Sequence, residues 1–206
     1  MPVETERWNH NLHYHRVILR AIPAGARRGL DVGCGEGILA RQLRQVLAEV
    51  TAIDIDAPSL ELARLADPDG AVDYICGDFL TYAFDDSSFD LVASVACLHH
   101  MDMAAALDKM AGLLRPGGTL ALVGIARSRY PRDLLFDALG SISTRLHQLT
   151  KTYWEHSAPT FWPPPLTYAE TRRVAEGALP HVAYRRHVLW RYSLLWRKPS
   201  SDRSGC

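Results

Sequence analysis

Strand-like apolar runs alternate with helix-like amphipathic segments over the first two thirds of the chain. The runs are nearly continuous in apolar residues, which is typical of parallel strands that helices cover on both faces. They are predicted at residues 29–32, 50–55, 72–76, 89–95 and 119–124. Because helical patterns lie between successive runs, the sequence predicts a doubly wound α/β sheet.

Helical periodicity places further segments around these strands. An amphipathic leading helix is expected over residues 8–22, and a second helix is expected to end near Leu47. A third is expected over residues 59–66. Asp102 is a suitable N-cap for a fourth helix, which continues through Leu114.

The pattern changes around the fifth strand. Pro116-Gly117-Gly118 predicts a turn that leads into it, and residues 127–166 after it hold a helical stretch and an aromatic, proline-rich segment. Thr167-Tyr168-Ala169-Glu170 is a capping-box sequence, which opens a helix to about Leu179. Two nearly contiguous strand-like runs within residues 181–197 predict a hairpin that joins the sheet.

Composition and charge restrict the kind of protein this is. The chain has 206 residues, the size of one α/β domain, and its 23 basic residues equal its 23 acidic residues. A net charge of zero argues against binding duplex nucleic acid. No apolar run approaches the ~20 residues needed to cross a bilayer, and the start, MPVETERWNH, lacks a signal-peptide layout. The four cysteines form no CxxC pair, so reduced thiols in a cytoplasmic protein are expected.

The run from Leu30 to Gly37, LDVGCGEG, carries the strongest chemical signal. Three glycines alternate directly between an apolar strand and a helical pattern. Glycine lets a ligand lie against bare backbone, and the start of a helix offers unpaired N–H groups. The run therefore predicts a site for a nucleotide-like cofactor.

Polar side chains also stand at the carboxyl ends of the next three strands, where ligands bind in open α/β sheets. Asp54 comes 21 residues after Gly33, a spacing at which a carboxylate can accept hydrogen bonds from ribose hydroxyls. Asp78 follows the third strand, and its side chain can accept a hydrogen bond from an exocyclic amine. His99 and His100 follow the fourth strand.

Five ordered segments now carry a family resemblance over about residues 25–126. LDVGCGEG, VTAIDID, CGDF, FDLVASVACLHHM and LRPGGTLALVG resemble, in order and spacing, a class I S-adenosylmethionine-dependent methyltransferase of the small-molecule, type 11-like kind. The third glycine comes one residue too early for the GxGxxG motif that binds nicotinamide dinucleotides, which favours the methyltransferase resemblance. The terminal YSLLWRK resembles that family's antiparallel last strand. The resemblance implies a Rossmann-like, doubly wound, seven-stranded sheet, mostly parallel with an antiparallel C-terminal strand.

The resemblance also implies which residues surround the methionine part of S-adenosylmethionine, whose product is S-adenosylhomocysteine. Asp31, Gly33, Gly35 and the backbone at Cys34 would do so, and Tyr14 of the leading helix is a candidate partner for the carboxylate. The simpler alternative for Asp31 is that it satisfies nearby backbone N–H groups. For Tyr14 the alternative is a place in the core or on the surface.

The nucleoside part of the cofactor has its own implied partners. Asp54 would hold the ribose, with Ile55 packed on the adenine face, and Asp78 and Phe79 would meet the adenine edge. Asp54 could instead be a solvated loop acid, and Asp78 could merely cap the next turn. Val95, or Ala96 beside it, would line the site near the sulfonium.

A general base is needed only if the acceptor arrives protonated. His99 and His100 are the candidates because they follow the fourth strand next to the expected sulfonium, and histidine titrates near neutral pH. Alternatively, one of them hydrogen-bonds the backbone and shapes the turn. The three histidines of residues 10–15 come without a matching acid cluster, so no metal site is expected.

Residues 127–166 are expected to form the acceptor pocket or its lid. Its candidate acceptor contacts are Tyr130, Tyr153, Trp154, His156 and Trp162, because large aromatics give an apolar wall with polar handles. The alternative is that most of them pack within the insertion.

We therefore expect a cytoplasmic enzyme, monomer or homodimer, that methylates a small molecule such as a specialised metabolite and binds neither nucleic acid nor membrane. The alternatives are a protein of the same fold with a non-methylating reaction and a binding or regulatory protein. One methyltransferase domain is expected over residues 1–199. Its parts are a leading helix (1–24), a cofactor-binding core (25–126), an acceptor-pocket insertion or lid (127–166), and a final helix with a hairpin (167–199), followed by a flexible tail (200–206).

Overall fold

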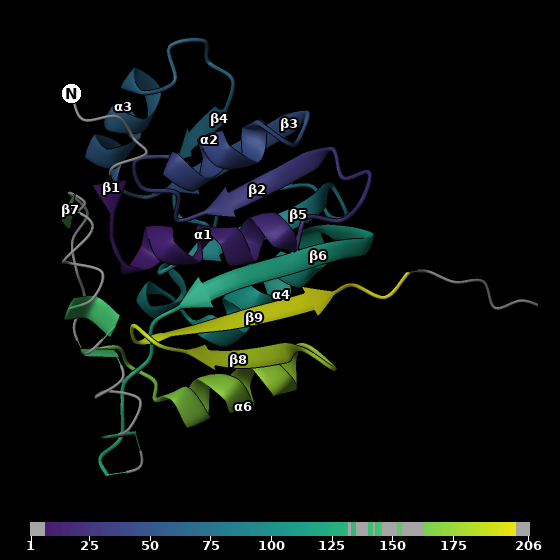
Figure 1. The fold of residues 1–206 in the computed structure, drawn as a ribbon. Helices are drawn as coiled ribbons and strands as arrows, with labels where there is room; N and C mark the ends of the chain where they lie inside the picture. The colour runs from purple at the N-terminus through teal and green to yellow at the C-terminus, as the bar shows by residue number, and fades with distance from the viewer. Residues whose placement is uncertain are drawn as a thin grey trace, which may run out of the picture.

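The fold is built around a seven-stranded sheet in the order β4-β3-β2-β5-β6-β9-β8 (Figure 1). The computed structural model describes residues 7–131, 133, 134, 140, 141, 143–145, 152, 153 and 163–200. The strands of the sheet are β2 (Arg28–Val32), β3 (Glu49–Asp54), β4 (Asp73–Cys76), β5 (Phe89–Val95), β6 (Leu114–Gly124), β8 (Ala183–His187) and β9 (Arg191–Arg197). The helices are α1 (His10–Arg20), α2 (Ile38–Arg44), α3 (Ala57–Leu65), η2 (Leu98–His100, a 3-10 helix), α4 (Met103–Leu113) and α6 (Tyr168–Ala178).

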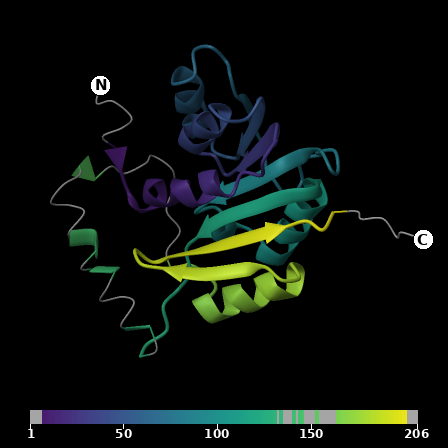
Figure 2. The same cartoon turned by 45° about the vertical axis from the view of Figure 1, so that its right-hand side comes forward.

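The pairing of the strands confirms the predicted fold class. Strands β4, β3, β2, β5 and β6 are mutually parallel, whereas β9 pairs antiparallel with both β6 and β8. Figure 2 shows β9 between β6 and β8, with α6 beside this edge of the sheet. The C-terminal hairpin is therefore an extension of a doubly wound sheet, as the sequence predicted.

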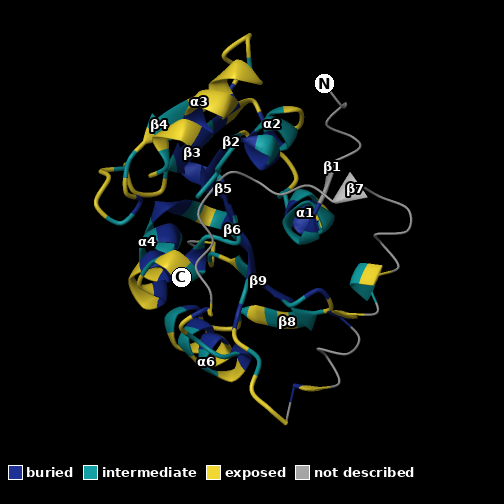
Figure 3. Ribbon diagram, turned by 90° about the vertical axis from the view of Figure 1, so that its left-hand side faces the viewer, coloured by how far each residue is buried: buried dark blue, intermediate teal, exposed yellow. Residues whose placement is uncertain are grey.

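Helices cover both faces of the sheet, and the strands alternate accordingly. Leu91 and Ala93 of β5 share a buried cluster with residues of α1 and α2, whereas Val92 between them packs in a cluster with α4 and α6. Figures 1 and 3 show α1 and α4 on opposite sides of the sheet, and Figure 3 shows its central strands mostly buried. Burial on both faces explains why these strands are continuous apolar runs.

Local capping sets where three of the helices begin. Asp102 accepts a hydrogen bond from the N–H of Ala105 at the start of α4, which confirms the predicted cap. Thr167 and Glu170 form the predicted capping box of α6. Asp56, which the sequence analysis did not single out, caps α3 through the N–H of Ser59.

The structure differs from the predictions at the start of β6 and at the end of α2. The turn expected at Pro116–Gly118 is wrong, because β6 begins at Leu114 and runs through these residues with an irregular register against β5. The N–H of Gly117 donates to Lys198 O, which holds this part of the strand against the end of β9. Helix α2 ends at Arg44, three residues before the predicted end. Most of the helical stretch predicted after Leu134 lies outside the described residues.

A small parallel pair of strands lies apart from the main sheet. Strand β1 (Arg7–Trp8) pairs in parallel with β7 (Thr152–Tyr153). Since β1 leads directly into α1, this pairing brings part of the predicted insertion beside the start of the leading helix.

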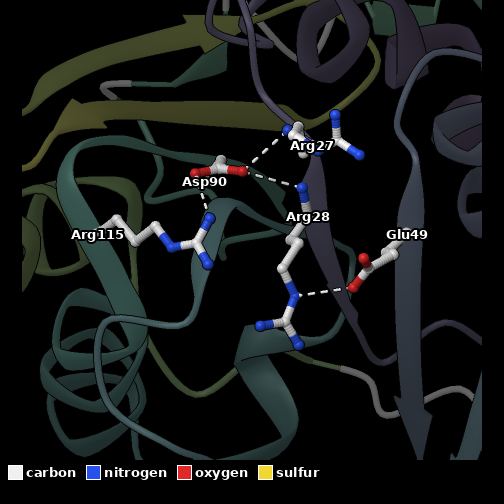
Figure 4. A network of polar contacts seen from close by, with 5 residues as sticks. All are labelled: Arg27, Arg28, Glu49, Asp90 and Arg115. Atoms are coloured by element: carbon white, nitrogen blue, oxygen red, sulfur yellow. Dashed lines mark hydrogen bonds and ion pairs between the residues drawn. The ribbon is translucent and has the colours of Figure 1, made fainter.

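The amino ends of the parallel strands are tied together by a polar network (Figure 4). Asp90 on β5 accepts hydrogen bonds from the N–H groups of Arg27 and Arg28 and from the guanidinium of Arg115. Partial burial raises the pKa of Asp90, but these three donors outweigh that effect and lower it below its usual value.

Among the described residues, no helix is long and apolar enough to cross a membrane.

Candidate functional site

A cavity of about 520 Å³ lies at the opposite end of the parallel strands from the Asp90 network. Its walls come from the ends of β2, β3, β4 and β5 and from the first turns of α1. Carboxyl ends of parallel strands are where open α/β sheets bind ligands. The cavity is therefore the candidate site, and it contains most of the residues predicted from the sequence.

The glycine turn forms one wall by exposing its backbone. Gly33, Gly35 and Gly37 all have positive φ, of 71°, 51° and 71°, in the left-handed region that favours glycine. A Cβ on Gly33 would lie 2.2 Å from Cys97 Sγ, so that position is closed by packing. A Cβ on Gly35 would have no atom of the described part of the chain within 4 Å, so this backbone faces open space at the cavity.

Asp54 stands where β3 ends and faces the glycine turn. Its Oδ2 accepts a hydrogen bond from Gly35 N at 2.7 Å, and its Oδ1 accepts one from Asp56 N at 2.9 Å. These bonds fix the carboxylate at the cavity wall instead of leaving it as a solvated loop acid. Ile55 follows it and lines the cavity with its side chain 73% exposed, so an apolar surface is available beside the acid.

Asp31 is the most unusual acid of the site. It lies on β2 with 1% of its surface exposed, and its Oδ2 is buried without a hydrogen-bond partner among the described residues. Burial, together with the nearby charge of Asp54, raises the pKa of Asp31 to about 7, although a hydrogen bond from the backbone of Ala40 opposes this rise. A buried acceptor with no donor is costly in a folded protein, so Oδ2 is suited to a ligand's donor.

The predicted adenine residues lie together after β4. Asp78 uses Oδ1 to accept a hydrogen bond from Leu80 N at 2.8 Å, so it caps the next turn as well as lining the cavity. Phe79 is buried, lines the cavity and lies beneath the Lys109 ammonium, which is 5.2 Å from the ring centroid. Both residues therefore stand at the same end of the cavity.

The two candidate bases differ in their relation to the cavity. Val95, Ala96 and His100 line it, whereas His99 is half-buried beside it with its ring centroid 4.0 Å from that of His100. Burial lowers the pKa of His99 to about 4, helped by the charges of His100 and Arg191. Burial also lowers the pKa of His100, although the charge of Asp54 opposes this. Both rings are therefore neutral near pH 7.

Two other predicted contacts lie away from the cavity walls. The hydroxyl of Tyr14 donates a hydrogen bond to Val188 O at 2.6 Å, and Tyr14 does not line the cavity. Tyr130 is 81% exposed and does not line it either. Trp154, His156 and Trp162 lie outside the described residues, as does the side chain of Tyr153.

Three polar cavity residues in α1 and at its N-cap were missed by sequence reasoning. Asn9 caps the helix, and Asn11 and His15 follow at positions that a helix brings to one face. His15 Nδ1 is 2.9 Å from Gln42 Oε1, and burial lowers the pKa of His15 to about 4, so the neutral ring donates to that amide. The i, i+4 spacing of Asn11 and His15 was the available signal.

Among the described residues, no group of three or more histidine, cysteine or acidic side chains is arranged to hold a metal ion.

Comparisons with known proteins agree with this geometry. Residues 30–122 match a family described as a methyltransferase domain. The chain is 38% identical over 193 residues to the uncharacterized methyltransferase Rv0089 of Mycobacterium tuberculosis, covering 93% of this chain and 98% of that protein. It is 32% identical to the demethylmenaquinone methyltransferase of Roseiflexus castenholzii, covering 80% of this chain and 73% of that protein.

Solved structures share the fold at lower sequence identity. The N-methyltransferase NodS of Bradyrhizobium japonicum superposes with a TM-score of 0.60 at 19% identity, covering 92% of this chain and 96% of that one. The [4+2]-cyclase SpnF superposes with a TM-score of 0.66 at 18% identity, covering 93% and 82%. These two likenesses concern the fold alone. The extended match to Rv0089 shows more, and this chain belongs to the methyltransferase family.

Proposed function

We propose that this chain transfers a methyl group from S-adenosylmethionine to a small-molecule acceptor. One observation carries the proposal: a single cavity joins the bare backbone of Gly35 to the unsatisfied Oδ2 of Asp31 and the fixed carboxylate of Asp54. A ligand with an ammonium group at one end and a ribose in the middle needs acceptors of this kind at both places.

The residues present fit the cofactor at each of its parts. Asp31 Oδ2 would accept a hydrogen bond from the ammonium group, and Gly35 leaves room for the chain that follows it. Asp54 would accept from the ribose hydroxyls. Ile55 and Phe79 offer apolar surfaces for the adenine, and Asp78 offers an acceptor for its amine.

When bound, the cofactor supplies a methyl group on a positively charged sulfur, which makes that methyl electrophilic. The protein's tasks are then to align the acceptor and to exclude water. His100 lines the cavity as a neutral ring near pH 7. Its unprotonated ring nitrogen can take the proton of a hydroxyl or ammonium acceptor.

Thr144 and β7, both within residues 127–166, lie beside the start of α1, which supports a role of this segment at the acceptor. Thr144 Oγ1 is 3.3 Å from His10 Nε2, and β7 pairs with β1 directly before α1. Asn9 and Asn11, in the same part of α1, line the cavity. We assign the acceptor pocket to the insertion because its described residues contact His10 and β1, which adjoin the cavity residues Asn9 and Asn11 in the chain. The net charge of zero and the demethylmenaquinone relative favour a small acceptor.

Cofactor binding is tested by calorimetry with S-adenosylhomocysteine on two glycine variants. Gly35→Ala places a methyl group in the open space of the cavity, so the affinity should fall by at least about 100-fold, or roughly 2.7 kcal/mol. Gly70→Ala is the matched control, because Gly70 also has positive φ (59°) and no atom within 4 Å of its Cβ position, but lies in the α3–β4 loop. Both carry the left-handed penalty of about 1–2 kcal/mol. Equal affinities in the two variants would contradict the assigned site.

Methyl transfer is tested with S-adenosylmethionine labelled on its methyl group. The label should pass into the small-molecule fraction of a cell extract, and not into its protein or nucleic-acid fractions. Asp54→Ala should abolish this transfer. Label recovered in macromolecules would overturn the acceptor class, and cofactor left intact while a small molecule is converted would favour a non-methylating reaction.

A further inference from the structure

Arg191 is a buried cation that reaches the cavity wall from the far end of the sequence. It is the first residue of β9, with 8% of its surface exposed. Its Nε and Nη2 donate to Asn11 Oδ1 at 3.0 and 2.7 Å. A forked contact of this kind fixes both side chains more closely than a single hydrogen bond does.

The other arm of Arg191 holds the turn between β8 and β9. Its Nη1 donates to Leu189 O at 3.2 Å and to Trp190 O at 3.3 Å. Leu189 and Trp190 have φ of 60° and 54°, in the left-handed region that such residues rarely occupy. The guanidinium is thus anchored to the turn on one side and to Asn11 on the other.

The contact determines what Asn11 can offer to a ligand. A guanidinium has only donors, so the amide oxygen of Asn11 must face Arg191. The amide NH₂ is then directed away from Arg191, and Asn11 is one of the residues that line the cavity. It stands in the first turn of α1, where the helix dipole favours a negative ligand group.

We propose that Arg191 is a positioning residue that acts through Asn11, holding its amide as a hydrogen-bond donor to the carboxylate of the bound cofactor. The inference rests on the proposed function. Asp31 Oδ2, in the same cavity, supplies the complementary acceptor for the ammonium group. Together the two side chains would recognise the amino-acid part of the ligand, with the donor set by a residue of the last hairpin.

The test compares two ligands that differ only at this end. S-adenosylhomocysteine has the amino-acid group, and 5′-methylthioadenosine lacks it. Arg191→Met should weaken S-adenosylhomocysteine roughly tenfold and leave 5′-methylthioadenosine unchanged within about twofold. In an Asn11→Ala background, Arg191→Met should cause no further loss. Arg197→Met is the matched control, because Arg197 lies on the same strand and contacts Gly117 O at an exposed position.

A second variant keeps the test independent of folding. Asn11→Asp retains an acceptor for Arg191 but removes the amide NH₂ donor, so the variant should remain folded. It should lose affinity for S-adenosylhomocysteine but not for 5′-methylthioadenosine. The inference is overturned if Asn11→Asp binds it as tightly as the parent does. It is also overturned if Arg191→Met lowers the affinity for both ligands equally. The same holds if Arg191→Met lowers the affinity for S-adenosylhomocysteine as much in the Asn11→Ala background as in the parent. A parent protein that binds neither ligand would instead refute the proposed function.

Discussion

Two aspartates at opposite ends of the parallel strands have opposite surroundings. Asp90, at the amino end of β5, accepts three hydrogen bonds, and its pKa lies below the usual value. Asp31, near the carboxyl end of β2, is more deeply buried, has an oxygen without a donor, and has a pKa raised to about 7. Deep burial and the neighbouring charge of Asp54 raise the pKa of Asp31, whereas three donors outweigh partial burial and lower the pKa of Asp90.

The same contrast extends to the backbone at each end. At the amino end, Lys198 reinforces β6 because its ammonium donates to Gly112 O and Leu114 O. At the carboxyl end, Gly35 leaves its backbone open to the cavity. At the amino end of the strands, these polar groups are therefore hydrogen-bonded within the protein. At the carboxyl end, polar groups are left to which a ligand would hydrogen-bond.

Replacing the unsatisfied acid should have the largest effect on stability. The folded-state pKa of Asp31 is raised, so its protonated form is favoured and stability is lost as pH rises from about 4 through about 7. Asp31→Asn removes that loss and should be more stable than the parent at pH 8 by up to about 4 kcal/mol, with no such gain near pH 4. Urea unfolding at both pH values measures this difference. The same variant should bind S-adenosylhomocysteine less tightly.

A gain in stability that is the same at pH 4 and pH 8 would contradict the raised pKa of Asp31. In the parent, ligand binding should also release a proton near pH 7, because an ammonium beside Asp31 favours its charged form. Calorimetry in buffers of different ionisation enthalpy detects that proton.

Replacing Asp90, the acid with three donors, should change the free energy of unfolding by less and in the opposite direction. Asp90→Asn places an amide donor among the N–H groups of Arg27 and Arg28, so the free energy of unfolding should fall by roughly 2–3 kcal/mol at pH 7. Because the pKa of Asp90 is lowered, its contribution is present above its usual pKa and is lost as pH falls below about 4. Asp69→Asn, at an exposed loop position, is the control. Affinity for S-adenosylhomocysteine should not change, and a loss comparable to that of Asp31→Asn would remove the distinction between the two ends.

Sequence alone predicted the features set by local residue patterns better than those set by contacts between distant segments. The parallel strands were predictable because burial on both faces makes them apolar, and the glycine turn because only glycine adopts its conformation readily. The strand conformation of Pro116–Gly118 was not predictable, since it depends on pairing with Lys198, directly after β9. Local patterns do not contain such long-range contacts.

The candidate site shows the same limit. Asp54 and Asp78 were found because each follows a strand, and strand ends converge in space. Asn11 was missed because its significance depends on Arg191, which is 180 residues away. Tyr14 lies on the same helix, but its hydroxyl is directed to Val188, so helical position alone did not identify the side chain that reaches the cavity.

The smallest expected effect concerns the pKa values of His99 and His100, at the cavity end of the sheet. His99 and His100 should both titrate below the usual histidine range, with His99 near pH 4, as followed by NMR of their ring protons and assigned with His99→Gln and His100→Gln. Arg191→Met should raise the pKa of His99 only slightly, because burial, and not the charge of Arg191, is the main cause of the lowering. Titration of either ring near pH 6.5 in the parent would contradict this. A neutral ring at pH 7 is the protonation state in which a histidine can act as a general base.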